Sequence, residues 1–386
     1  MKRSRSKEAV ALSLAILVVG LSLLLAACGG SGNSNSTGES ESSSTPQSGG
    51  SGGEGTGGSE AGGVDVGTGK PIPLDASELK VAYVPAALST PETQNAKEGI
   101  EKVASEAGIK VEIFDPGFDP AKQYALYQNV IDSGKFNALV TLPLAGEQSC
   151  EILSKTAPEK GIAVSVFSLP ICGREFEAAK GNGLWAPGTV ATVGIITNNE
   201  GLEAWANSCE KETGGGETIL INGAAGSPNF KQMTQAFEKT NMKVVADYAT
   251  LYETSEALEK TSAALAAHPN LKVVVAQAPP LTQGVIQALK AAGKTPGVDV
   301  KVCSFDGGGQ EMIERVKAGE VAVDAYANNE WIASAALQSI IEAAEGHQIP
   351  RVIVPGEDGK IEQSGSAPWP PTYTKETADQ YTPTGA

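Results

Sequence analysis

From Leu79 onward, short apolar runs alternate with polar turns and longer amphipathic stretches. The stretches at residues 96–108, 121–134 and 256–269 repeat apolar side chains at the spacing of a helix that buries one face. Strands are expected over the apolar runs at residues 79–84, 111–114, 138–142, 162–167, 190–196, 218–221, 243–248, 272–277 and 300–305. Helices are expected to end at glycines in the left-handed conformation, namely Gly108, Gly134, Gly161 and Gly293. This alternation predicts an α/β fold with parallel sheets covered by helices on both faces.

The number of expected strands, about ten, is large for one doubly wound sheet, so the pattern favours two Rossmann-like lobes. Binding crevices in such sheets lie beyond the carboxyl ends of the strands. The residues that follow the apolar runs are therefore candidates for a shared cleft: residues 85–88, Asp115, 142–143, 168–169, Ala224, Tyr252, 278–279, Asp306 and 327–328.

The N-terminus carries the pattern of an export signal. Four basic residues among the first seven precede an apolar stretch at residues 9–25. The following "LAAC", ending at Cys28, resembles the lipobox of bacterial lipoprotein precursors, in which cleavage leaves the cysteine as the lipid-carrying N-terminus. A transmembrane helix is the alternative, because the apolar stretch is nearly long enough to span. Small residues before the cysteine favour processing, so residues 1–28 are interpreted as a signal peptide and lipobox.

Residues 29–77 hold no aromatic side chain and are dominated by Gly, Ser, Thr and Glu. Such a segment buries too little apolar area to offset its chain entropy, so a disordered linker is expected there. Removal of residues 1–27 leaves 25 basic and 44 acidic residues, a formal charge of −19. A chain this acidic excludes nucleic acid and anionic membrane surfaces as partners.

Four cysteines remain after Cys28: Cys150, Cys172, Cys209 and Cys303. Outside the cytosol they allow two disulfides in three connectivities, or buried thiols. The chain has two histidines and no CxxC motif, so neither a metal site nor a cofactor is expected.

Several stretches together resemble one known family, the ribose-type periplasmic solute-binding proteins of ABC importers. The likeness covers residues 78–355 and rests on "FDPGFDPAKQ" (114–123), "AAHPNLKVVVAQ" (266–277) and "VCSFDGGGQEMIERVKAGEV" (302–321), with "YTKETADQY" (373–381) beyond it. The resemblance implies two lobes joined by three crossings and a ligand held between them.

By position, the implied crossings fall near Asn198, near residues 327–328 and near Pro355. The implied domains are 78–197 with 328–355 for lobe 1, and 198–327 with 356–386 for lobe 2. The family placement of the cysteines favours a Cys150–Cys172 disulfide in lobe 1. Cys209 and Cys303 then share lobe 2, either bonded or as thiols.

The pocket that the resemblance implies departs from the sugar-binding pattern. The Asp-Arg pair after the fourth strand is replaced by Ser168 and Leu169, and an arginine after the sixth strand falls on Met233. Asp306 and Tyr252 carry over directly. The ligand is therefore expected to be small, uncharged and less hydroxylated than a pentose. The implied ligand-binding residues are Ala86, Thr90, Glu92, Leu142, Ser168, Leu169, Met233, Tyr252, Ala278, Asp306, Asn328 and Trp331.

Structural roles compete with ligand binding at several of these positions. Asp306 is also placed to cap the helix that begins after Gly309. Tyr252 is equally suited to the core, and Asn328 to holding the backbone of a crossing. Trp185 and Trp331 could each stack on a ligand or pack under a loop.

The resemblance implies a lipid-anchored, monomeric solute-binding protein on the outer face of the cell membrane, with permease subunits of an ABC importer as partners and no catalytic step. A sensory receptor that hands its closed form to a signalling partner is one alternative. A hydrolase using the same cleft is the other, although the expected strands and helices contain no nucleophile elbow of the GxSxG type. A transcription repressor is excluded, because the chain has no basic helix-turn-helix pattern and begins with an export signal.

Overall fold

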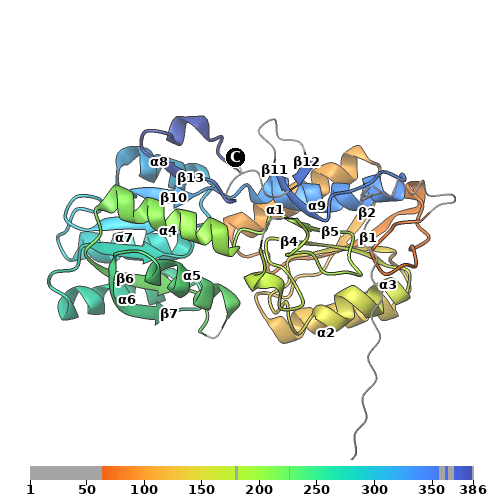
Figure 1. Ribbon diagram of the computed structural model, residues 1–386, viewed down its shortest axis with the longest axis horizontal. Coiled ribbons are helices and arrows are strands. Elements are labelled where there is room, and N and C mark those ends of the chain that lie inside the picture. Colours follow the sequence, from red (N-terminus) through yellow and green to blue (C-terminus); the bar gives the residue numbers. More distant parts are fainter. Residues whose placement is uncertain (1–62, 179–180, 226, 356–360, 364–368, 385–386) are drawn as a thin grey trace, which may run out of the picture. The chain divides into compact units, whose positions relative to one another are not determined.

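The computed structural model describes residues 63–178, 181–225, 227–355, 361–363 and 369–384. These residues form two α/β lobes, each built on a mostly parallel sheet with helices on both faces (Figure 1). Cys28 and residues 29–62 of the expected linker lie outside the described residues. Within the described part, the helices are too short or too polar to cross a bilayer.

The sheet of lobe 1 has seven strands, of which the edge strand β12 is antiparallel to its neighbour. Their order is β12 (Ile361–Gln363), β11 (Val352–Pro355), β5 (Ala191–Val193), β4 (Ala163–Phe167), β3 (Ala138–Thr141), β1 (Lys80–Val84) and β2 (Lys110–Ile113). The helical segments of this lobe are η1 (Ala76–Glu78), α1 (Pro91–Glu106), α2 (Pro120–Asp132), the π-helix η2 (Ile152–Thr156), α3 (Ala157–Glu159), η3 (Arg174–Phe176) and α9 (Asn329–Ala344).

Successive side chains of a strand point to opposite faces of the sheet, and β1 illustrates how that places the helices. Val81 and Tyr83 pack in the cluster that contains the buried faces of α1 and α9. Ala82 and Val84 pack in the cluster that contains α2, η2 and α3. Both faces of β1 are therefore buried, which explains its nearly continuous apolar run.

The sheet of lobe 2 has six strands, with one antiparallel edge strand, β13. Their order is β13 (Thr372–Thr374), β10 (Val323–Ala325), β9 (Lys301–Ser304), β8 (Val273–Ala276), β6 (Glu217–Asn222) and β7 (Lys243–Ala249). The helical segments are α4 (Asn199–Thr213), α5 (Pro228–Glu238), α6 (Thr254–Ala267), α7 (Pro279–Ala291), α8 (Gln310–Ala318) and η4 (Ala378–Gln380). All nine expected strands are present, with bounds that differ by a few residues.

The chain passes from the first sheet to the second between β5 and α4, returns between β10 and α9, and passes again after β12. The first two passages lie where the family resemblance placed them. The third lies later than the expected Pro355, because residues 361–363 add a strand to the first sheet by pairing with β11. Assignment of the whole segment 356–386 to lobe 2 is therefore wrong for β12.

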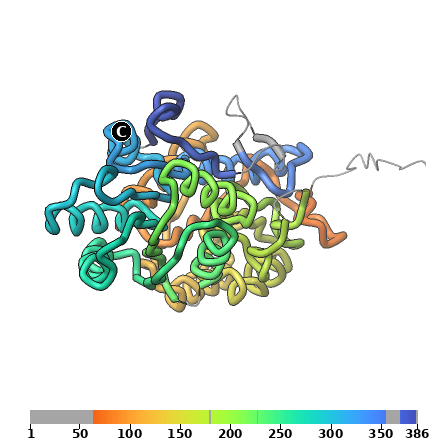
Figure 2. Tube along the Cα trace, turned by 60° about the vertical axis from the view of Figure 1, so that its left-hand side comes forward, coloured from red at the N-terminus to blue at the C-terminus, as the bar shows by residue number. Residues whose placement is uncertain are grey.

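The N-terminal end of the described chain is folded, contrary to the linker expected up to residue 77. Val64 and Ile72 form an antiparallel bridge, with main-chain hydrogen bonds of 2.8 and 2.9 Å. The side chains of Val64, Val66, Ile72 and Leu74 are buried in the core of lobe 1. We call residues 63–74 the N-terminal clasp. It lies at the edge of lobe 1, beside the end of α9 (Figures 1 and 2).

Trp185 and Arg351 fasten the N-terminal clasp to lobe 1. The Arg351 guanidinium donates to the Asp65 carboxylate at 2.7 Å and lies 4.7 Å from the centre of the Trp185 ring. A Cβ on Gly67, whose φ is +70°, would lie 2.2 Å from that ring. Trp185 thus packs under a loop, and its alternative as a ligand-stacking residue is wrong.

Two disulfides are present. The Cys150–Cys172 bond joins the segment before η2 to the loop after β4, which confirms the favoured pairing. The Cys209–Cys303 bond joins α4 to β9 in lobe 2, so the alternative of buried thiols is wrong. In the part of the chain that the structure covers, no group of three His, Cys, Asp or Glu side chains could hold a metal ion.

Candidate functional site

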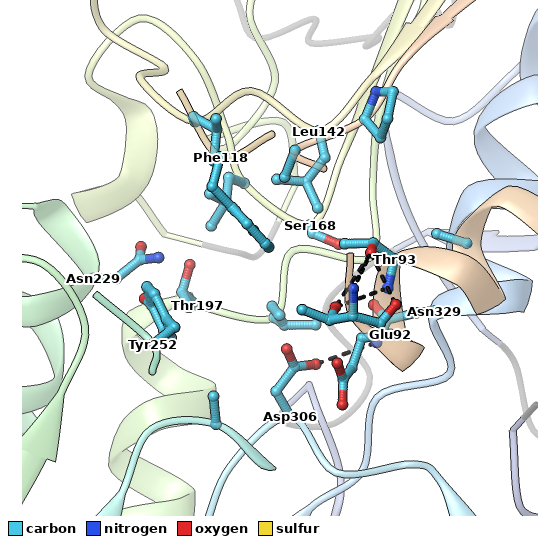
Figure 3. Close-up of a pocket in the computed structure, with 18 of the residues that line it drawn as sticks. Glu92, Thr93, Phe118, Leu142, Ser168, Thr197, Asn229, Tyr252, Asp306 and Asn329 are labelled. Carbon is cyan, nitrogen blue, oxygen red and sulfur yellow. Dashed lines mark hydrogen bonds between the residues drawn. The ribbon is translucent and has the colours of Figure 1, made fainter. Parts of the chain in front are cut away.

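A pocket of about 180 Å³ is lined by residues that follow the strands of both sheets (Figure 3). The strand-end rule therefore identifies part of its wall. The residues that line it are Tyr83, Pro85, Ala86, Thr90, Glu92, Thr93, Ala96, Phe118, Leu142, Leu144, Ser168, Leu169, Ile196, Thr197, Asn229, Tyr252, Gln277, Ala278, Pro279, Pro280, Phe305, Asp306 and Asn329.

Strained backbone marks this pocket. Five non-glycine residues of the described chain have positive φ, and four of them line the pocket: Phe118, Ser168, Tyr252 and Asp306, with φ between 59° and 64°. Such conformations cost about 1–3 kcal/mol each for ordinary residues and persist where the surroundings hold them in place. The loops after β2, β4, β7 and β9 thus place these four side chains in the wall of the cavity.

Glu92 enters the pocket from the first turn of α1. Thr90 caps this helix: its hydroxyl accepts from the Thr93 amide, and the Thr93 hydroxyl lies within hydrogen-bonding distance of the Thr90 amide. Pro91 at the first helical position fits the same start. The helix N-terminus stabilises a carboxylate in this position.

Asp306 enters from the other lobe, after β9. Its Oδ1 accepts a hydrogen bond from Asn329 Nδ2 at 3.5 Å. Burial raises the pKa of Asp306 to about 8, with the nearby charge of Glu92 acting in the same direction. Figure 3 shows the carboxyl groups of Glu92 and Asp306 close to one another. Gly309, not Asp306, caps α8, so the helix-capping alternative for Asp306 is wrong.

The glycines after Asp306 serve packing inside lobe 2. A Cβ on Gly307 would lie 2.0 Å from Asp324 Oδ2, and one on Gly308 would lie 2.0 Å from the Ala327 carbonyl oxygen. Asp324 is fully buried and accepts a hydrogen bond from the Tyr373 hydroxyl at 2.7 Å. Burial holds the pKa of Asp324 well above its usual range.

Gln123 positions the loops of lobe 1 and was missed by the sequence analysis. Its side-chain amide donates to the carbonyls of Pro85 and Leu142, both at 2.8 Å. Its side-chain oxygen accepts from the Leu144 amide at 2.8 Å. One buried glutamine on α2 therefore joins the ends of β1 and β3, and only its 1% exposure in the folded chain reveals that role.

Hydroxyl groups in the wall of the pocket have no hydrogen-bond partner among the described residues. They belong to Tyr83, Ser168 and Thr197, whose side chains are buried. A buried hydroxyl without a partner costs about 1–3 kcal/mol. A bound molecule that supplies partners would recover that energy.

The aromatic wall comes from Phe118 and Tyr252. Phe118, in the loop after β2, is 43% exposed, which is unusual for so large an apolar side chain. Burial and the charge of Asp306 raise the pKa of Tyr252 to about 12, while a hydrogen bond with Asn229 opposes this shift. The alternative that Tyr252 is only a core residue is thus wrong, since it also faces the cavity.

Nine of the twelve expected ligand-binding residues line the pocket: Ala86, Thr90, Glu92, Leu142, Ser168, Leu169, Tyr252, Ala278 and Asp306. Met233 does not, because it lies on the fully buried face of α5. Asn328 does not line it either, because its side chain caps α9 by accepting from the Trp331 amide at 2.9 Å. Trp331 packs against the core of α1 and α9. The pocket amide at this crossing is the next residue, Asn329.

The polar or aromatic lining residues outside the twelve implied ones are Tyr83, Thr93, Phe118, Thr197, Asn229, Gln277, Phe305 and Asn329. Two signals could have found Asn329 and Thr197. Adjacent asparagines before a helix leave one for the cap and one for another role. Thr197 follows an apolar run, as the other strand-end candidates do.

Comparisons with known proteins agree with this architecture. A model of the family described as "Periplasmic binding protein domain" matches residues 81–348. Ribose import binding protein RbsB of Haemophilus influenzae is 24% identical over 276 residues, covering 70% of this chain and 87% of that protein. The D-allose-binding periplasmic protein of Escherichia coli is 26% identical over 275 residues, covering 69% of this chain and 85% of that protein.

Among solved structures, an ABC transporter periplasmic solute binding protein from Actinobacillus succinogenes with bound D-allose has a TM-score of 0.63. It is 22% identical to this chain, and the match covers 79% of this chain and 100% of that one. This likeness shows that the two proteins share the two-lobed fold.

Proposed function

This chain belongs to the periplasmic binding protein family, and we propose from that premise that it captures a small solute between its two lobes for the permease subunits of an ABC importer. The observation that supports the proposal is that residues following the strands of both sheets line the same pocket. A solute that contacts both lobes favours the conformation in which they are closed on it. The importer would recognise that conformation.

We also propose that the protein works at the outer face of the cell membrane. The basic and apolar start of the chain and the "LAAC" ending at Cys28 support a lipid-anchored form. The Gly- and Ser-rich residues 29–62 would then serve as the tether, and the folded part would act as a monomer.

The pocket favours a solute that is less hydroxylated than a sugar. Several apolar side chains line it, namely Phe118, Leu142, Leu144, Leu169 and Ile196. Glu92 and Asp306 are the only charged residues in the described lining, so anions are excluded by repulsion. Uncharged molecules and cations are the two classes that such a wall admits.

No chemical step is proposed. The curated relatives described above are binding proteins, and neither His268 nor His347 is among the lining residues. A sensory role would use the same clamp, and it differs from transport in its partner. Loss of solute uptake on deletion of the gene supports transport, and retained uptake with a lost response supports sensing.

A thermal-shift screen of the full-length protein tests the proposal. The panel would contain sugars, polyols, small alcohols, small amides and small amines. We expect at least one class to raise the melting temperature progressively with concentration, as a ligand that binds only the folded state must. The absence of any stabilising compound would contradict the proposal. Strong stabilisation by ribose or glucose would contradict the proposed character of the pocket.

The same screen gives a site test. Asp306→Ala should weaken binding of the best solute by about 1–3 kcal/mol, because it removes a partner of the ligand inside the pocket. Asp132→Ala, which removes an exposed carboxyl outside the pocket, is the matched control. Unchanged affinity of the Asp306 variant would remove that residue from the site.

A further inference from the structure

The two carboxyl groups of the pocket come from opposite lobes and lack a basic partner there. Glu92 lies on α1 of lobe 1, and Asp306 follows β9 of lobe 2. Among the described residues, no lysine, arginine or histidine lines the pocket. Arg315 shares a neighbouring groove with Glu92, but its guanidinium contacts Glu311 at 2.5 Å and Glu320 at 2.9 Å. The guanidinium of Arg315 is thus engaged elsewhere.

We infer that the solute is a small organic cation, with an ammonium group held between Glu92 and Asp306 and an apolar body against Phe118, Leu142 and Leu169. This inference rests on the proposed function and names the class of solute. It replaces the expectation of an uncharged ligand, because that expectation rested on aligned positions without the two facing carboxyl groups.

The hydrogen-bonding groups of the wall favour a donor ligand. The side-chain amide of Asn329 is already directed at Asp306. This donor is therefore used within the protein, while the carboxyl oxygens remain as acceptors. An ammonium group supplies three donors and no acceptor.

Buried hydroxyls give a second, independent indication of a ligand. Ser168 is 1% exposed and Thr197 is 4% exposed, both line the cavity, and neither hydroxyl has a partner among the described residues. Each hydroxyl oxygen has lone pairs that can accept from a bound N–H group. Ser168 and Thr197 would offer these lone pairs to N–H groups of a bound molecule inside the cavity.

The polarity of the pocket is divided between two ends. Figure 3 shows Glu92, Asp306 and Asn329 gathered at one end, with Phe118 and Leu142 on the other side of the cavity. Tyr252 also lines the cavity, so its ring is available to contact a bound cation. This division suits a head group and an apolar tail, whereas a sugar carries hydroxyls all round.

A cation also explains how binding would couple to closure. Burial and the charge of Glu92 on the opposite lobe favour a proton on Asp306 in the free protein. An ammonium group between the two carboxyl groups takes the place of this proton, which passes to solvent, and is attracted to both carboxylates, so it favours the closed form by its contact with both lobes. An uncharged solute gains no such pair of attractions.

Isosteric pairs test the inference by isothermal titration calorimetry on the full-length protein. The probes are isoamylamine with isoamyl alcohol, and cyclohexylamine with cyclohexanol, at about pH 7.5, where alkylamines are protonated. We expect each amine to bind about tenfold tighter than its alcohol or better, because each replaces a neutral hydrogen bond with a charged pair. Equal or tighter binding of the alcohols, or no amine binding at about 10 mM, would overturn the inference.

Charge-neutralising variants supply the matched test. Glu92→Gln and Asp306→Asn should each weaken amine binding about tenfold while changing alcohol binding less than about twofold. Glu98→Gln removes the same charge from an exposed position of α1 and should change neither. Equal losses for amine and alcohol would show that the carboxyls do not select charge, and would overturn the inference.

The outcome separates this inference from the proposed function. If a neutral solute stabilises the protein in the general screen and the amines do not bind, the inference of a cationic solute is wrong and the proposed solute-binding function is retained. If no compound of any class binds, both fall.

Discussion

At the scale of single residues, Asp306 combines backbone strain, burial and the proximity of another acidic side chain. It follows a buried strand, adopts a φ of 64°, and lies beside Glu92 with a single amide partner. The sequence identified it from strand position and family likeness. Its raised pKa depends on burial and on a carboxylate more than two hundred positions away, which no local pattern contains.

The titration of Asp306 predicts how the stability of the free protein changes with pH. Its pKa rises from 3.8 to about 8 on folding, so the folded state holds a proton that the unfolded state releases in that window. The free energy of unfolding should therefore fall as the pH rises from about 4 to about 8. Asp306→Asn should flatten this fall. The measurement is urea unfolding at several pH values.

Other acidic groups lie near Asp306, namely Glu92 on α1, Asp324 on β10 and Tyr252 after β7. Only the difference between the native protein and Asp306→Asn therefore isolates this carboxyl. Parallel pH profiles for the two proteins would show that Asp306 is not buried as a protonated acid.

At the scale of elements, α1 and α9 illustrate a packing that depends on a missing side chain. A Cβ on Gly99 of α1 would lie 2.1 Å from the Glu330 carbonyl oxygen and 2.6 Å from Ser334 Oγ of α9. The two helices therefore approach more closely than any other residue at this position would permit. The N-termini of both helices reach the pocket, which is lined by Thr90 before α1 and by Asn329 at the start of α9.

Gly99→Ala tests the helix contact. Although alanine favours a helix by about 1 kcal/mol over glycine, forcing the helices apart should give a net loss of about 1–3 kcal/mol in the free energy of unfolding. Ser105→Ala, at an exposed position of the same helix, should stay within about 0.5 kcal/mol of the native value. Denaturant unfolding measures both. Equal stability of the two variants would mean that the close approach is absent.

At the scale of the whole molecule, the N-terminal clasp sets where the folded protein begins. Its composition is that of a linker, and its four buried aliphatic side chains are separated by glycines, prolines and charged residues. Contacts with Trp185 and Arg351, which lie far along the chain, fix it in place. The proposed tether is therefore shortened to residues 29–62, and the folded part begins with the N-terminal clasp of lobe 1.

Ile72→Ala distinguishes a folded clasp from a linker. Truncation of a side chain that is 2% exposed should lower the free energy of unfolding by about 2–5 kcal/mol. The same substitution at exposed Lys70 should have little effect. Thermal and denaturant unfolding report the loss. If Ile72→Ala is as stable as the control, the segment behaves as a tether to residue 77.

The sequence by itself determined the features that follow from local rules. Apolar runs and the helical period located nine strands and the helices between them, and the strand-end rule found nine pocket residues, since both depend on near neighbours in the chain. Tertiary structure decided the rest. It placed Met233 on a buried helix face, gave the cap to Asn328 and the pocket to Asn329, and brought Glu92 opposite Asp306. These placements depend on contacts between side chains that are far apart in the sequence, and patterns of neighbouring residues do not contain that information.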